Sequence, residues 1–186
     1  GQEDELQREL AFYRTMGVMQ GLHKEFTRWP VFLDQFLKLL AEATGFSHCF
    51  FAAREADGDN YHLEGTSRSF DLDEEDTTQP IGAGLVGWVF KNNTPVFSSD
   101  EEPGRASLPL LGKRVRTAQL KSVICLPVTF MKTVRGVLGL AGEEPGLVND
   151  QARIFASTAA DHLSLFLENR YLKSTLRQAG ASSAPS

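Results

Sequence analysis

Two apolar runs joined by a short connector constrain the fold of this chain more than any other stretch. The runs cover residues 122–130 and 134–141, and Met131, Lys132 and Thr133 lie between them. Val, Ile, Thr and Phe are frequent, which favours strands, and each run is short for a buried helix. A connection of this length is typical of an antiparallel hairpin. Because nearly every residue of both runs is apolar, we expect a central hairpin that is covered on both faces.

The composition is that of an ordinary water-soluble protein. The 186 residues are enough for one domain with a sizeable core. A formal net charge of −5 argues against a sequence-independent nucleic-acid surface. No stretch has the length of a transmembrane helix, and the charged first residues do not fit a signal peptide. We therefore expect a cytoplasmic domain that acts on neither a membrane nor a nucleic acid.

Two helices are predicted before the hairpin. Residues 2–22 carry apolar or small side chains at a 4-3-4 spacing that begins at Leu6, which gives a narrow seam of the coiled-coil type. Residues 31–44 have a wide apolar face at helical spacing and are expected to form a core helix. Pro30 is placed to begin this helix, and Gly45 is placed to end it.

A third long helix is predicted after the hairpin. Residues 149–178 carry an apolar stripe at helical spacing, and Asn149 or Asp150 can serve as the N-cap. The small and polar residues 179–186 are predicted to form a flexible tail or linker.

Shorter elements fill the middle of the chain. Apolar runs predict strands over residues 46–54 and 61–67, with a turn between them. Residues 85–92 predict a short helix, and residues 95–97 predict a short edge strand, where proline is tolerated. Because Pro127 lies within the first run of the hairpin, we expect a local break in the hydrogen-bond ladder at this residue.

Three further segments share features with ligand-binding loops. The acidic segment 70–78 lacks the glycine of an EF-hand loop and is predicted to be a solvated loop. The segment 80–87 is rich in glycine but lacks the lysine and Ser/Thr of a Walker motif. Residues 100–117 are long for a loop in a compact domain, which is typical of a functional or mobile segment such as a lid. Arg114 and Arg116 within it can meet an anion or simply face solvent.

Four short segments follow one another in a recognisable order. They are GLVGWVF at 84–90, TPVF at 94–97, SVICLPV at 122–128 and RGVLGL at 135–140. In their order and spacing they are similar to the GAF domain, and the resemblance covers residues 31–171. It implies an α+β, profilin-like fold whose central antiparallel sheet carries the long N- and C-terminal helices on one face. The short helix and the loops then cover the other face and form a pocket.

The resemblance also divides the chain. Residues 1–27 become an N-terminal signalling or dimerisation helix, and residues 28–172 become the GAF domain. The C-terminal helix, 149–178, continues beyond the domain as a linker, and residues 179–186 form the flexible tail. If the native chain is longer, the resemblance implies an output domain such as a kinase, a cyclase or a transcriptional regulator.

This sequence lacks the residues that carry the known chemistries of GAF domains. The NKFDE-type signature of cyclic-nucleotide-binding members is absent. Cys125 lies inside a predicted strand rather than on a loop that could attach a bilin. The segment around Gly87 has no thiol of the kind that free-methionine-sulfoxide reductases use. Cys49 and Cys125 both lie in apolar runs and are expected to be buried thiols rather than a disulfide. No metal-ligand spacing relates the histidines, which are His23, His48, His62 and His162.

An apolar pocket with a few polar groups remains as the expected site. Its predicted lining is Phe51, Trp88, Phe90, Phe97, Arg114, Arg116, Cys125 and Leu138. Trp88 can stack on an aromatic ligand or simply pack the core, and Arg114 or Arg116 can meet a ligand anion. Gly136 and Gly139 remove side-chain bulk at places where another group can approach closely. The sequence identifies no cofactor.

We expect a non-catalytic sensory or regulatory module of a bacterial signal-transduction protein. It binds an unidentified small ligand, forms a homodimer through its terminal helices, or does both. The predicted seam between two copies consists of Leu6, Leu10, Tyr13, Leu163, Phe166, Leu167 and Leu172. One alternative is a dimerisation scaffold without a ligand, in which side chains of the domain fill the pocket. The second alternative is an enzyme similar to free-methionine-sulfoxide reductase, which the cysteine pattern does not support.

Overall fold

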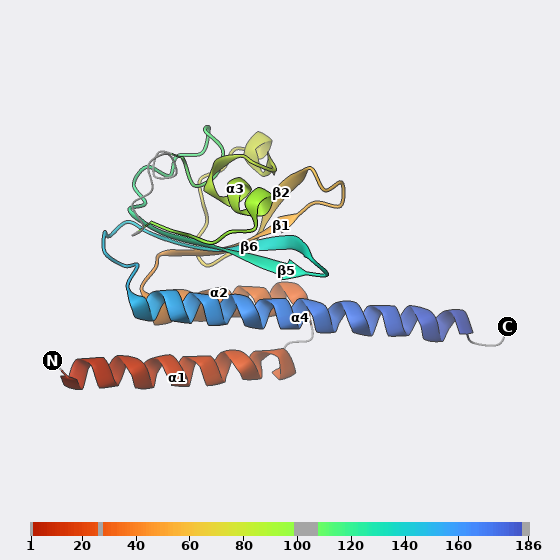
Figure 1. The fold of residues 1–186 in the computed structure, drawn as a ribbon, viewed down its shortest axis with the longest axis horizontal. Coiled ribbons are helices and arrows are strands. Elements are labelled where there is room, and N and C mark those ends of the chain that lie inside the picture. Colours follow the sequence, from red (N-terminus) through yellow and green to blue (C-terminus); the bar gives the residue numbers. More distant parts are fainter. Residues whose placement is uncertain (1, 26–27, 99–107, 184–186) are drawn as a thin grey trace.

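An antiparallel sheet with helices on both sides organises the structure (Figure 1). A computed structural model of the chain describes residues 2–25, 28–98 and 108–183. Within these ranges the sheet has six strands in the order β3-β2-β1-β6-β5-β4, and all neighbours are antiparallel. The elements are α1 (Gln2–Glu25), α2 (Trp29–Thr44), β1 (His48–Arg54), β2 (Asn60–Thr66), η1 (Glu74–Asp76), β3 (Thr78–Pro80), α3 (Gly84–Asn92), β4 (Val96–Phe97), β5 (Ser122–Phe130), β6 (Thr133–Gly142) and α4 (Asp150–Ser183). The predicted α+β fold class is confirmed.

The predicted central hairpin is present as β5 and β6. Phe130 pairs with Thr133 across the turn, so the turn is shorter than expected because Thr133 already belongs to β6. Met131 and Lys132 adopt positive φ angles of 51° and 63°. This left-handed backbone matches the twist of the flanking strands in a two-residue hairpin turn.

The ladder of the hairpin is irregular near Pro127 but not at Pro127. Pro127 stays in register with Val137, and the register shift falls between Val128 and Thr129. The prediction of a break at Pro127 is therefore wrong in position. In the described part of the chain β4 pairs with β5 only as far as Cys125. Pro127 thus lies where β5 forms the edge of the sheet, and an edge strand tolerates the missing N–H.

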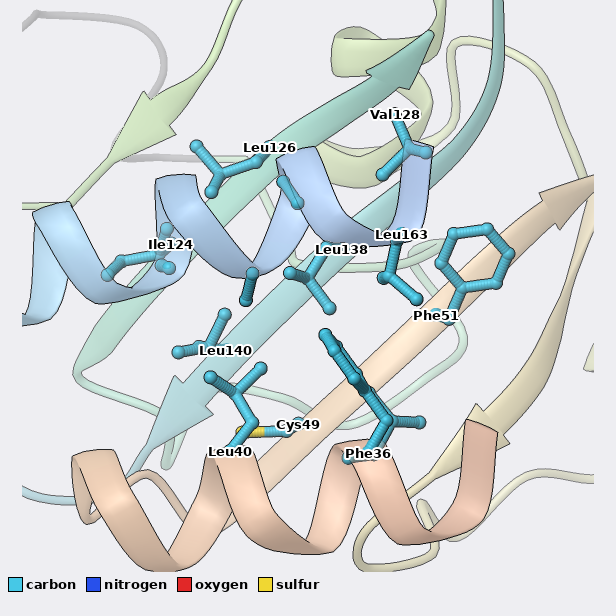
Figure 2. Packing of buried hydrophobic residues seen from close by; sticks show 14 of the residues in the cluster. Phe36, Leu40, Cys49, Phe51, Ile124, Leu126, Val128, Leu138, Leu140 and Leu163 are labelled. Carbon is cyan, nitrogen blue, oxygen red and sulfur yellow. The ribbon is translucent and has the colours of Figure 1, made fainter. Parts of the chain in front are cut away.

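Two long helices cover one face of the sheet, as predicted. Figure 1 shows α2 and α4 beneath the sheet and α1 beneath these two helices. In Figure 2, Phe36 and Leu40 of α2 and Leu163 of α4 point toward Phe51 and Leu138 of the strands. The buried residues of this layer, here called the helix-side cluster, are Trp29, Phe32, Leu33, Phe36, Leu37, Leu40, Phe46, Cys49, Phe51, Ile124, Leu126, Val128, Leu138, Leu140, Ala152, Phe155, Ala156, Ala159, Ala160 and Leu163.

The ends of α2 and α4 follow the sequence signals. Pro30 lies in the first turn of α2. Gly45 ends α2 with a φ angle of 79°, and its N–H donates to the Ala41 carbonyl at 2.9 Å. The Asn149 side chain caps α4 by accepting a hydrogen bond from the Ala152 N–H at 2.8 Å. The predicted start and stop signals are therefore confirmed at these three positions.

α4 is longer than the sequence pattern predicted. The helix continues to Ser183, so residues 179–183, which were predicted to form a flexible tail or linker, are helical. The rest of that predicted tail, 184–186, lies outside the described residues. Gly180 weakens a helix by only about 1 kcal/mol relative to alanine. The first residue in this stretch that the interior of a helix rejects is Pro185.

The strand β3 gives no recognisable signal in the sequence. It pairs with the outer edge of β2, with Pro80 opposite Asn60. It begins at the end of the acidic segment 70–78, which was predicted to be a solvated loop and which also contains η1. Its residues, Thr-Gln-Pro, lack the alternation of apolar and polar side chains that identifies a half-buried strand.

Candidate functional site

The face of the sheet opposite α2 and α4 is covered by α3 and by residues 108–120. α3 lies over β5 and β6 (Figure 1). Residues 108–120 form no helix or strand, yet they bury several apolar side chains against the sheet and α3. The buried residues of this layer, here called the α3-side cluster, are Phe50, Ala52, Tyr61, Leu85, Val86, Val89, Phe90, Val96, Leu110, Leu111, Val115, Leu120, Val123, Cys125, Val134, Val137 and Ala141.

Three of the residues predicted to line the pocket lie on this side. Phe90 and Cys125 are buried in the α3-side cluster, and Trp88 packs against it. The Phe90 ring stacks on Tyr61 with the ring centroids 5.3 Å apart. The Tyr61 hydroxyl donates a hydrogen bond to the Ala83 carbonyl at 2.8 Å, which ties β2 to the segment that precedes α3. Sequence reasoning missed Tyr61, although an aromatic residue at the start of a predicted strand was an available signal.

Three other residues predicted for the same pocket lie on the opposite face. Phe51 and Leu138 belong to the helix-side cluster, and Phe97 packs against that cluster. Successive side chains of a strand point to opposite faces, so Phe50 rather than Phe51 faces α3. The prediction that Phe51, Phe97 and Leu138 share a pocket with Phe90 is therefore wrong.

Phenyl rings of the chain itself fill the space beside two glycines of β6. A Cβ atom on Gly136 would fall on the ring of Phe51, and a Cβ atom on Gly139 would fall on the ring of Phe50. The prediction that a group approaches these glycines closely is confirmed. The approaching groups are side chains of the domain, one in each cluster, rather than a ligand.

The glycine-rich segment before α3 is not an open phosphate loop. The Leu85 N–H donates to the Pro109 carbonyl at 2.8 Å, and the Val86 N–H donates to the Leu110 carbonyl at 3.1 Å. These amides lie in the first turn of α3, where free N–H groups commonly bind anions. Carbonyl groups of residues 108–120 occupy them instead.

The two predicted anion-binding arginines lie in different surroundings. Arg114 Nη1 lies 3.1 Å from Glu75 Oε2, and Arg114 Nε lies 3.7 Å from Asp76 Oδ1. Arg116 is exposed. Asp76 is buried, so the acidic segment is not wholly solvated as predicted. The exposed pair between Arg114 and Glu75 contributes at most about 1 kcal/mol, so it can hold residues 108–120 only weakly.

The two cysteines lie on opposite faces of the sheet. Cys49 belongs to the helix-side cluster and Cys125 to the α3-side cluster, and both are free thiols. Burial raises the pKa of Cys125 to about 12 and also raises the pKa of Cys49. Because the thiolate is the nucleophilic form, neither side chain suits nucleophilic catalysis near neutral pH.

His48 is a buried histidine at the start of β1. Its Nδ1 lies 2.8 Å from the Ser47 hydroxyl, and its ring lies 4.9 Å from the Phe70 ring. Burial lowers the pKa of His48, and the positive charge of Arg68 lowers it further, whereas the Glu143 carboxylate opposes the shift. Across the described ranges, no three His, Cys, Asp or Glu side chains gather as a metal site would require.

The residues predicted to form a dimer seam on α1 lie at the surface. Leu6, Leu10 and Tyr13 are 58%, 54% and 68% exposed. They are spaced four and three residues apart, which places them on one side of the helix. In the single chain, this apolar stripe of α1 is therefore exposed and can contact a second copy.

The residues predicted for the same seam on α4 differ in their surroundings. Leu163 is fully buried in the helix-side cluster. Phe166 stacks on Phe32 with the ring centroids 4.0 Å apart, and Leu167 packs against the same cluster. Leu172 is exposed. Leu163 is therefore a core residue of its own chain and offers no surface to a second copy.

The comparison with known families agrees with this architecture. The family model described as "GAF domain" matches residues 29–168. The chain belongs to the GAF domain family. The match covers the sheet, α2, α3 and the first part of α4, and it leaves out α1. None of the curated protein sequences is a significant match to this GAF domain.

Solved structures share this fold at low sequence identity. The GAF domain of an Acinetobacter phosphoenolpyruvate-protein phosphotransferase is 19% identical with a TM-score of 0.67, and the match covers 89% of this chain and 95% of that chain. Free methionine-R-sulfoxide reductase from Neisseria meningitidis, solved with its substrate, is 20% identical with a TM-score of 0.66, and the match covers 92% and 91%. The nlh2 GAF domain of A. aeolicus, solved in an inactive state, is 20% identical with a TM-score of 0.62, and the match covers 88% and 99%. At these identities the matches show a common fold and no more.

Proposed function

We propose that this GAF domain is a non-catalytic regulatory module of a bacterial signal-transduction protein that works in the cytoplasm. It binds a small ligand on the α3 side of the sheet and forms a homodimer through its terminal helices. An output domain such as a kinase, a cyclase or a transcriptional regulator responds when it is joined to the same chain. GAF domains similar to this one occur in a phosphotransferase and in the nlh2 protein. No described helix has the length and the apolar character that crossing a membrane requires.

One observation carries the ligand-binding role. Residues 108–120 cover a face of the central sheet although they belong to no helix or strand. They are held by buried side chains that include Leu110, Leu111 and Val115, by two hydrogen bonds to the first turn of α3 and by the ion pairs of Arg114 with Glu75 and Asp76. Such a cover can move aside while the strands and long helices stay intact. A ligand that occupies the space beneath it stabilises one arrangement of the cover over the other.

The strand β5 offers the route from this side to the long helices. Cys125 faces the α3-side cluster, and its neighbours Ile124 and Leu126 belong to the helix-side cluster. α4 packs directly against β5. A shift of β5 on ligand binding is thus transmitted to α4 through side chains that are already in contact.

A thermal-shift screen of the whole chain against purines, cyclic nucleotides, tetrapyrroles and amino acids tests the ligand site. A true ligand at one hundred times its Kd adds about 2.7 kcal/mol to the free energy of unfolding and raises the Tm further with concentration. Trp88→Ala removes a side chain that packs against the α3-side cluster and is expected to abolish the shift. Val31→Ser, an exposed position on α2, is the control and is expected to retain it. The same shift in Trp88→Ala and in the wild type would place the site elsewhere.

A dimerisation scaffold without a ligand is the second candidate. The observation that favours it is the filling of the α3 side by the Phe50 ring beside Gly139 and by residues 108–120. For a scaffold, no compound class changes the Tm, while dimerisation persists in analytical ultracentrifugation.

An enzyme of the free-methionine-sulfoxide-reductase kind is the third candidate, and the thiol chemistry opposes it. Since both cysteines are buried with raised pKa values, we expect no reaction of the folded chain with a thiol reagent at pH 7.5. Turnover of free methionine sulfoxide that disappears in Cys125→Ser would establish the enzyme and remove the first two candidates.

A further inference from the structure

The outer face of α4 carries an apolar stripe that the domain core does not use. Leu165, Leu172 and Leu176 are 56%, 49% and 71% exposed. At 100° per residue, Leu165 lies on nearly the opposite side of the helix from Leu163, which is fully buried in the helix-side cluster. Figure 1 shows the C-terminal part of α4 extending past the end of the sheet. The stripe therefore continues along a part of the helix whose described residues 168–180 are all exposed.

The stripe has the spacing of a coiled coil. Leu165, Asn169, Leu172, Leu176 and Ala179 follow one another at intervals of four, three, four and three residues. This spacing assigns the residues to heptad positions d, a, d, a and d. The seam and the core-facing residues use different sides of one helix, so a second chain can pack on the seam while Leu163 stays in the helix-side cluster.

The charges beside the stripe fit a second copy of the same helix in parallel orientation. In this heptad Glu168 occupies a g position, and Lys173 occupies the e position of the next heptad. The two residues flank the seam on opposite sides, so they cannot meet within one helix. In a parallel pair, position g of one helix faces position e of the next heptad on its partner, so Glu168 meets Lys173 twice.

Asn169 is the polar residue of this seam. A single asparagine at an a position of a two-stranded coiled coil pairs with its counterpart and fixes both the register and the number of chains, at a cost in affinity. We propose that residues 165–179 of α4 pair with the same residues of a second copy as a parallel, in-register, two-stranded coiled coil in which Asn169 sets the register. This rests on the proposed homodimer and specifies its partner surface and geometry.

Analytical ultracentrifugation of the whole chain tests the seam. Leu172→Ser and Leu176→Ser are each expected to weaken dimerisation by at least about tenfold, because each removes a leucine from both sides of the interface. Val31→Ser, which removes an apolar side chain that is equally exposed on α2, is the control and leaves the Kd unchanged. A dimer that survives both seam variants but dissociates in Leu10→Ser would overturn the coiled coil on α4 and keep the proposed homodimer. A monomer at every concentration would overturn both.

Charge reversal tests the orientation. Glu168→Lys and Lys173→Glu each place like charges across the seam and weaken dimerisation, and the double variant is expected to recover the wild-type Kd. If the single variants weaken dimerisation and the double variant does not recover the wild-type Kd, the parallel pairing is overturned.

Two measurements test the register and the role of Asn169. Ser174 and Gln178 occupy the outward positions f and c of this heptad. Spin labels on Ser174→Cys and, in a separate protein, on Gln178→Cys are expected to give similar distances between copies. An antiparallel pair centred on Leu172 would separate the second labels by about 18 Å along the axis, since a helix rises about 1.5 Å per residue. Asn169→Leu is expected to tighten association at least about tenfold and to produce species larger than a dimer. Unchanged mass and affinity in Asn169→Leu would place Asn169 outside the seam and overturn the proposed register.

Discussion

The sharpest test of the sheet is the substitution of Gly139 by alanine. Gly139 pairs with Phe50 on β1 and with Cys125 on β5, so its backbone is held by neighbours on both sides. A Cβ atom at this position would overlap Cζ and both Cε atoms of the Phe50 ring. Phe50 is fully buried, and its ring meets the Phe70 ring edge-on with the centroids 5.4 Å apart. An added Cβ atom therefore forces the ring or the strand to shift.

The expected loss of stability in Gly139→Ala follows from this overlap. Adding a methyl group to a packed core costs about 1–3 kcal/mol, and a site with a rigid ring and two fixed strands belongs at the upper end, about 3 kcal/mol. For a chain of this length each kcal/mol lowers the Tm by about 2–4 °C, so Gly139→Ala is expected to lower it by about 6–12 °C. Shortening the ring makes room again, so Gly139→Ala and Phe50→Leu together are expected to cost at least about 1 kcal/mol less than the sum of the two.

Urea unfolding followed by circular dichroism gives these free energies. The matched control is Gly21→Ala on α1, where an added Cβ atom has no heavy atom within 4 Å. A glycine-to-alanine change in an open helix position is expected to be neutral or stabilising, by up to about 1 kcal/mol. If the free energy of unfolding of Gly139→Ala is within about 0.5 kcal/mol of that of the wild type, the Phe50 ring does not fill the space beside β6. That result would refute the conclusion that side chains of the domain fill the α3 side.

Two further predictions concern polar groups at the ends of elements. Asn149→Ala removes the cap of α4 and is expected to cost about 1 kcal/mol in urea unfolding, whereas Asn149→Ser, which retains a capping oxygen, is expected to cost much less. The lowered pKa of His48 means that near its ordinary value of 6.5 the unfolded chain binds more protons than the folded chain. The stability from neutral His48 is therefore complete above about pH 6.5 and is lost as the pH falls toward the folded pKa. His48→Gln is expected to flatten unfolding free energies measured between pH 7.5 and pH 5, and an equally steep pH dependence in this variant would show that other groups cause the slope.

Local signals predicted much of the fold. The apolar runs around residues 122–141 predicted the central hairpin, and Pro30, Gly45 and Asn149 marked helix ends that the structure confirms. Each of these signals acts within a few residues, because a cap or a tight turn is decided by neighbouring backbone groups. β3 was missed because it depends on pairing with β2 rather than on any pattern of its own.

The candidate site was predicted less well because it depends on which way each strand faces. Phe50 and Phe51 are adjacent phenylalanines, so composition could not tell which one faces α3. A shift of one residue moves every side chain of a strand to the other face, and both faces of this sheet are apolar. The hydrogen bonds from the first turn of α3 to the carbonyl groups of Pro109 and Leu110 could not be predicted either. Backbone contacts of a loop do not depend on a pattern of side chains.

The division of the core into two layers has a consequence for experiment. The chain contains two tryptophans and two cysteines, and the sheet separates them into matched pairs. Trp29 and Cys49 lie in the helix-side cluster, whereas Cys125 lies in the α3-side cluster with Trp88 packed against it. Each half of the molecule therefore carries its own native fluorophore and its own native labelling site. Single Trp→Phe variants and pulsed alkylation can follow the order in which the two halves open, without any foreign probe.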